Sequence, residues 1–222
     1  MLSLAGSEVG SAPRGRRAWL VGAVALAALG LDLVLHAEPW HLRLLPAVAS
    51  FALTASLVRD RRALGLGLAP RPGLRYWLAG TLVIGGVVAA ALALVALAVL
   101  LASGPEGLRL PPHVTPAWLR SRLGLSLVEA PLFEEAIYRL APCAALVASL
   151  GRPAAVAVSG GTFAALHFLY GNPSADNFVA GFLFAWAFLR SETLLVPVAL
   201  HALGNACAVL LTWLAWLAGL GS

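Results

Sequence analysis

Apolar runs long enough to cross a bilayer recur along most of this chain. A run of about 18 apolar residues is enough for one transmembrane helix, and 60% of the 222 residues are hydrophobic while only 11% are charged. The short alternating segments of a transmembrane β-barrel are missing. We therefore predict an all-α, polytopic integral membrane helix bundle with about seven spans (six to eight). The predicted spans are 18–35, 41–58, 77–102, 123–150, 153–170, 178–189 and 194–217.

The basic residues predict how the bundle lies in the membrane. All fifteen are arginines, and many fall in short loops such as 59–75, which is typical of cytoplasmic loops. The net charge of +5 therefore indicates topology rather than nucleic-acid binding, and we expect a cytoplasmic N-terminus. The all-arginine usage and the high Ala and Leu content suggest a bacterial source, and hence the bacterial inner membrane. Cys143 and Cys207 lie in apolar runs and are interpreted as packing residues.

The predicted organisation is one membrane domain with three parts. Residues 1–17 are expected to be a disordered, basic N-terminus, and residues 18–116 the N-terminal transmembrane helices and loops. Residues 117–222 are expected to form the helix bundle that carries the chemistry. The run at 18–35 is preceded by arginines, as in a signal peptide, but it is long and lacks a clean cleavage site. We therefore expect an uncleaved first span.

Charged residues stand inside the predicted span 123–150. A charge at bilayer depth costs about 3 kcal/mol even on a lenient scale, so such residues usually mark a functional site. Glu135 and Arg139 are four residues apart, with the acid first, and are predicted to form an ion pair on one helix face. Glu134 points about 100° away from that face. This spacing suggests that Glu135 is neutralised by Arg139 while Glu134 is available as a general base.

Two further spans carry polar groups within apolar sequence. Phe163 and His167 are one turn apart on the span 153–170, and His201 and Asn205 are one turn apart on the span 194–217. A carboxylate and an imidazole can together hold and deprotonate a water. A second imidazole and an amide can donate hydrogen bonds to a developing oxyanion. The set suits hydrolysis of an amide bond, and no serine or cysteine fits better as a nucleophile.

The ordered triple of motifs resembles a known family. Glu134-Glu135-x-x-x-Arg139, Phe163-x-x-x-His167 and His201-x-x-x-Asn205 look like the three motifs of the CPBP family, the CAAX-type and bacteriocin-processing intramembrane glutamic proteases. The resemblance covers about residues 123–210. It implies catalytic roles for Glu134, His167, His201 and Asn205, supporting roles for Glu135 and Arg139, and either a substrate-groove or a simple packing role for Phe163. No cofactor is expected.

The resemblance implies an endopeptidase that cleaves a membrane-associated protein or peptide within the lipid bilayer. It leaves CAAX-like processing, peptide maturation and C-terminal sorting-signal removal open. One alternative is a zinc metalloprotease with Glu134, His167 and His201 as ligands, which is disfavoured because His-Glu-x-x-His is absent. The other is a non-enzymatic, proton-coupled carrier or scaffold, since intramembrane acids and histidines also build proton relays.

Overall fold

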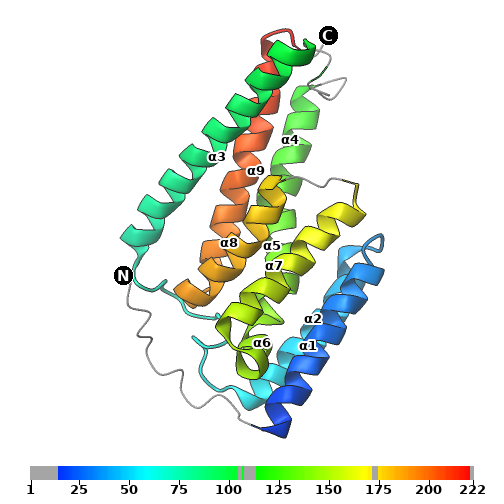
Figure 1. The fold of residues 1–222 in the computed structure, drawn as a ribbon, viewed down its shortest axis with the longest axis vertical. Coiled ribbons are helices and arrows are strands. Elements are labelled where there is room, and N and C mark those ends of the chain that lie inside the picture. Colours follow the sequence, from blue (N-terminus) through cyan, green and yellow to red (C-terminus); the bar gives the residue numbers. More distant parts are fainter. Residues whose placement is uncertain (1–14, 105–106, 108–113, 172–174, 221–222) are drawn as a thin grey trace. The chain divides into compact units, whose positions relative to one another are not determined.

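The described part of the chain is helical. The structure, a computed structural model, describes residues 15–104, 107, 114–171 and 175–220. Within these ranges there is no strand, only an isolated bridge between Leu66 and Thr193, which confirms the predicted all-α class. The elements (Figure 1) are α1 Arg16–Val34, α2 Trp40–Leu57, α3 Leu74–Ser103, α4 Pro116–Gly124, the π-helical turn η2 Leu125–Glu129, α5 Ala130–Glu135, the π-helical turn η3 Ala136–Leu140, α6 Cys143–Leu150, α7 Arg152–Leu169, α8 Ala175–Ser191 and α9 Leu195–Leu217.

Each predicted span corresponds to a helical segment of the structure. By length and composition, three of the described helices could each cross a membrane: α1, α3 and α9. The number of crossings in the bilayer remains a prediction. The N-terminus predicted to be disordered lies largely outside the described residues, because residues 1–14 are not described and α1 begins at Arg16.

The chain divides into two compact units. The first unit contains residues 1–73 and 133–197, and the second contains residues 74–132 and 198–222. In the first unit α1 packs against α2 and α6, while α7 packs against α6 and α8; α1 and α2 run side by side in Figure 1. The apolar core of this unit includes Ala25, Leu29, Ile137, Tyr138 and Phe163.

Two glycines let α7 and α8 approach closely. A Cβ atom built on Gly160 would lie 2.9 Å from the Cα of Phe182, and one on Gly181 would lie 2.7 Å from the carbonyl oxygen of Gly160. Neither site has room for a methyl group beside the neighbouring backbone. The next residue, Gly161, has no atom within 4 Å of such a Cβ. The close crossing of α7 and α8 therefore depends on glycine at 160 and 181 but not at 161.

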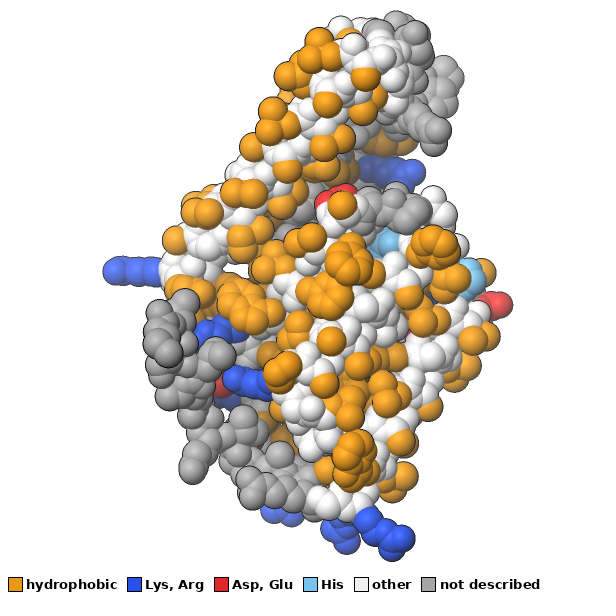
Figure 2. Space-filling view, viewed as in Figure 1, with side chains coloured by type: hydrophobic (Ala, Val, Ile, Leu, Met, Phe, Trp, Pro, Cys, Tyr) orange, Lys and Arg blue, Asp and Glu red, His pale blue; other side chains and the backbone are white. Residues whose placement is uncertain are grey.

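The second unit contains α3, α4, η2 and α9. In α3 only Trp77 and Gly85 are buried, and a Cβ on Gly85 would lie 2.5 Å from the Leu203 side chain of α9. The exposed residues of α3 include many leucines and valines, as expected of a helix that contacts lipid. Figure 2 shows apolar side chains scattered across the visible face, with few charged side chains between them.

The span predicted at 123–150 is not one regular helix. It consists of α4, η2, α5, η3 and α6 in succession, with two residues in a turn before α6. Each π-helical turn ends shortly before a proline: η2 precedes Pro131, and η3 precedes Pro142. A proline has no N–H and its ring collides with the carbonyl four residues earlier, and a wider π turn removes that collision. The segment 123–150 was predicted as a single span, and the structure instead interrupts its α-helix with a π-helical turn before each of the two prolines.

Candidate active site

The two glutamates lie on a short α-helical segment between two π-helical turns. α5 ends at Glu135, and η3 begins directly after it. The N–H of Ala130 donates to the carbonyl of Leu125, and the N–H of Ala141 donates to the carbonyl of Ala136 at 3.0 Å, both across five residues. Single π turns within helices are frequent at functional sites.

Glu135 and Arg139 form the predicted ion pair. The Nε of Arg139 lies 3.0 Å from a carboxylate oxygen of Glu135, and both side chains are fully buried. Arg139 also donates to the carbonyl of Gly181 on α8 at 3.4 Å. Its guanidinium lies 4.7 Å from the centre of the Phe163 ring on α7, a cation–π contact. The ion pair of the motif therefore also holds α7 and α8 against η3.

Glu134 is buried like its neighbour but has different surroundings. Its side chain is 7% exposed, and the ion pair with Arg139 engages Glu135. Glu134 lies within electrostatic range of the hydroxyls of Tyr138 and Tyr170. The two adjacent carboxylates thus occupy distinct environments, as the sequence predicted from their positions on the helix.

Phe163 connects the first motif to the second. Its ring is 1% exposed and meets the Tyr138 ring edge-on, with centroids 5.8 Å apart. The His167 ring lies 4.5 Å from it, and the Nδ1–H of His167 donates to the Phe163 carbonyl at 3.0 Å. These contacts favour the packing role of Phe163. Because Nδ1 of His167 donates to the Phe163 carbonyl, Nε2 is the acceptor nitrogen of the neutral His167 imidazole.

His201 and Asn205 lie on α9, in the second unit. The Asn205 amide donates to the backbone carbonyl of Ser126 in η2, with a distance of 2.7 Å. This carbonyl lacks a helical partner, since the N–H of Ala130 bonds to Leu125 and Pro131 has no N–H. The proline-induced π turn thus creates the acceptor that anchors Asn205.

The structure brings together the residues of the first two motifs. Glu134, Glu135, Arg139, Phe163 and His167 all belong to the first unit, whereas the third motif belongs to the second unit. The meeting of all three motifs in one site remains a prediction. Within either unit, no three His, Cys, Asp or Glu side chains of the described residues gather as a metal site would require.

Comparison with known proteins agrees with the motif pattern. Residues 116–207 match the family model described as type II CAAX prenyl endopeptidase Rce1-like, a segment that contains all three motifs. Over this segment the match supports the predicted family. CAAX-type proteases of this family hydrolyse peptide bonds, and the apolar helices of this chain are consistent with an integral membrane protein. No match was found among curated proteins or among solved structures.

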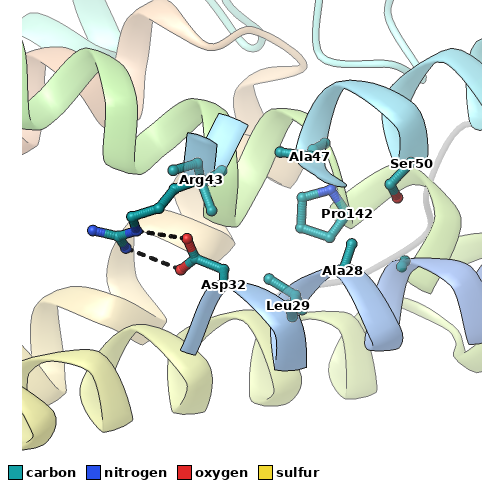
Figure 3. A pocket seen from close by; sticks show the side chains of 10 residues that line it. Ala28, Leu29, Asp32, Arg43, Ala47, Ser50 and Pro142 are labelled. Atoms are coloured by element: carbon teal, nitrogen blue, oxygen red, sulfur yellow. Dashed lines mark hydrogen bonds and ion pairs between the residues drawn. The ribbon is translucent and has the colours of Figure 1, made fainter. Parts of the chain in front are cut away.

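The first unit has a second group of buried polar residues, which the sequence analysis missed. Arg43 of α2 forms an ion pair with Asp32 of α1 through two hydrogen bonds, from Nε at 2.8 Å and from Nη2 at 3.0 Å. Both side chains are 1% exposed, and Figure 3 shows them pointing toward each other. The same guanidinium donates to the hydroxyls of Tyr138 and Tyr170. The cost of a charge in an apolar run, which drew attention to Glu134, could have found both residues.

A small cavity adjoins this ion pair. Its volume is about 10 Å³, and its lining includes Asp32, Arg43, Ala47, Ser50 and Pro142 (Figure 3). The space suits a single water molecule, for which about 10–15 Å³ is needed. It is far too small for a peptide. The Asp32–Arg43 pair is therefore not part of a substrate cleft at this cavity.

Proposed function

We propose that the chain is a glutamic-type intramembrane endopeptidase. Glu134 and His167 activate a water molecule, and His201 and Asn205 stabilise the oxyanion that forms. Glu135 and Arg139 support Glu134. The observation that carries the proposal is the ordered set of three motifs within the single segment, 116–207, that matches the CAAX endopeptidase family.

The proposed reaction forms no covalent bond between enzyme and substrate. The water transfers a proton to the Glu134–His167 pair while its oxygen bonds to the carbonyl carbon, and the carbonyl π electrons move to the oxygen. Hydrogen-bond donors from His201 and Asn205 stabilise that negative charge. The tetrahedral intermediate then breaks its C–N bond, and the stored proton goes to the leaving nitrogen.

The local geometry supports these roles. Hydrogen bonding of Nδ1 to the Phe163 carbonyl makes Nε2 the basic nitrogen of His167. The Glu135–Arg139 ion pair has no net charge, and Glu135 directly follows Glu134 in the chain. An amide nitrogen carries two N–H donors, so the hydrogen bond to Ser126 fixes Asn205 and leaves a second donor on the same nitrogen for the oxyanion.

The proposed substrate is a membrane-associated protein or peptide cut in the bilayer, with no nucleic acid involved. The three open forms of processing are CAAX-like cleavage, peptide maturation and removal of a C-terminal sorting signal. The proposed location is a bacterial inner membrane with the N-terminus in the cytoplasm, because the arginine-rich loop 59–75 follows the pattern of cytoplasmic loops. The proposed mechanism uses no cofactor.

The test combines a defined reporter with an unbiased search. The purified protein in liposomes is given a farnesylated peptide ending in a CAAX sequence, and membranes of cells that express wild type or Glu134→Gln are compared by proteomics. We expect uncut membrane substrates to accumulate with Glu134→Gln and not with Glu129→Gln, which alters an exposed glutamate in η2. Equal processing by wild type and Glu134→Gln would exclude the proposal.

A further inference from the structure

Residues of the N-terminal helices α1 and α2 contact tyrosines that lie close in sequence to the first two motifs. We propose that Arg43, held by Asp32, is a positioning residue that fixes the motif helix carrying Glu134 relative to the helix carrying His167, through the hydroxyls of Tyr138 and Tyr170. The inference rests on the proposed function and extends it to residues outside the family segment 116–207.

Two tyrosine hydroxyls converge on the guanidinium of Arg43. The Nη2 of Arg43 donates to the Tyr138 hydroxyl at 3.1 Å, and its Nη1 donates to the Tyr170 hydroxyl. The Tyr138 hydroxyl in turn donates to Asp32, and the Tyr170 hydroxyl donates to the carbonyl of His36. Three of the four side chains are almost completely buried, and Tyr170 is 44% exposed. One guanidinium therefore joins elements that are distant in sequence.

Both tyrosines lie close in sequence to proposed catalytic residues. Tyr138 follows Glu134 by four residues in η3, and Tyr170 follows His167 by three residues as the cap of α7. Each tyrosine is thus about one helical turn beyond a proposed catalytic residue. The Tyr138 ring also contacts Phe163, which carries the carbonyl that orients His167. Moving either hydroxyl relative to Arg43 would change the spacing of Glu134 and His167.

The guanidinium of Arg43, the hub of this network, is held in one orientation. An arginine guanidinium is planar, and its donors form a fixed fork that a lysine cannot reproduce. Asp32 engages two of these donors, and the Trp40 ring lies 4.3 Å below the guanidinium. Asp32 and Trp40 therefore fix the orientation of the Arg43 guanidinium independently of the two tyrosines. A displacement of about 1 Å between reacting groups can reduce a rate by about 100-fold, so a rigid hub has a catalytic consequence.

The experiment removes single hydroxyls from the network. Tyr138→Phe and Tyr170→Phe keep the rings, and Tyr76→Phe is the matched control because Tyr76 is the third tyrosine and lies exposed on α3. With the farnesylated CAAX reporter in liposomes, we expect each network variant to lower kcat by about tenfold to 100-fold at unchanged KM. The control Tyr76→Phe is expected to match wild type in both melting temperature and activity. Arg43→Lys is expected to lower kcat in the same way.

A double variant separates positioning from independent effects. If both tyrosines act through Arg43, Tyr138→Phe/Tyr170→Phe loses less activity than the product of the two single losses. A multiplicative loss, a loss matched by the fraction of unfolded protein, or kcat values within twofold of wild type would each overturn the inference. Full activity of Glu134→Gln in the same assay would instead overturn the proposed function, so the two failures are distinguishable.

Discussion

The described part of the molecule contains two buried ion pairs that arise in different ways. Glu135 and Arg139 lie within one continuous helical segment, four residues apart. Asp32 and Arg43 lie on two helices, α1 and α2, and are eleven residues apart. Both pairs are almost completely shielded from solvent. The first follows from helical spacing alone, whereas the second exists only because two helices pack side by side.

The two pairs also differ in what surrounds the arginine. The Arg139 guanidinium contacts a phenylalanine ring and donates to a backbone carbonyl of α8. Arg43 contacts a tryptophan ring and donates to two tyrosine hydroxyls. A buried ion pair is often no more stabilising than an apolar pair of similar size, but removal of one partner is costly. The comparison suggests that both pairs orient other groups rather than add stability.

The largest expected effect is on the cleavage rate, and it comes from Glu134, which belongs to neither ion pair. Glu134→Gln is expected to lower the cleavage rate by about 100- to 10,000-fold, because a general base is removed, without lowering the melting temperature. His167→Ala is expected to act similarly, with His41→Ala, an exposed histidine, as its control. The measurement is single-turnover cleavage of the reporter by folded protein. A normal rate for Glu134→Gln would break the distinction between the two glutamates.

The next effect is the loss of protein stability when one partner of either ion pair is removed. Arg139→Ala and Arg43→Ala each leave a buried carboxylate without its ion-pair partner, so we expect each to lower the free energy of unfolding by about 3–5 kcal/mol. The paired replacement Asp32→Leu/Arg43→Met is expected to unfold within about 1 kcal/mol of wild type yet retain a reduced kcat. Reversible unfolding in detergent and reporter cleavage measure the two quantities. Full activity of the paired replacement would show that the Asp32–Arg43 pair has only a structural role.

A smaller effect on the free energy of unfolding is expected at the crossing of α7 and α8, which the Glu135–Arg139 pair contacts through Gly181. The carbonyl to which Arg139 donates belongs to Gly181, which lies at the close crossing of α7 and α8. Gly160→Ala is expected to cost about 1–3 kcal/mol of unfolding free energy by overpacking this crossing. Gly161→Ala is its neighbour control and is expected to be neutral or stabilising by up to about 1 kcal/mol. Equal effects of the two substitutions would contradict the crossing geometry.

The smallest expected effect is that of metal removal. In the proposed mechanism the buried carboxylates act as a base and as an ion-pair partner, so strong chelators are expected to leave reporter cleavage unchanged. The measurement is the cleavage rate before and after exhaustive dialysis against a chelator, with metal analysis of the purified protein. Loss of activity that returns on addition of Zn²⁺ would favour the disfavoured alternative, a zinc metalloprotease.

Much of the fold could be predicted because the helices are encoded locally. The helical segments, the all-α class and the Glu135–Arg139 pair all depend on apolar run length or on spacing within one turn. The π-helical turns were missed, although Pro131 and Pro142 mark both of them in the sequence. Asp32 and Arg43 were visible as charges in apolar runs, but no local rule indicates which partner each would choose.

The sequence by itself determined the helical membrane bundle, the three motifs and the different surroundings of Glu134 and Glu135, because each of these depends on residues close together along the chain. Only the tertiary structure decided that Arg43 meets Asp32, Tyr138 and Tyr170, and that Asn205 bonds to Ser126. Those contacts join residues 11 to 127 positions apart. The Arg43 contacts depend on helix packing, and the Asn205 contact depends on the Ser126 carbonyl near Pro131; local spacing describes neither.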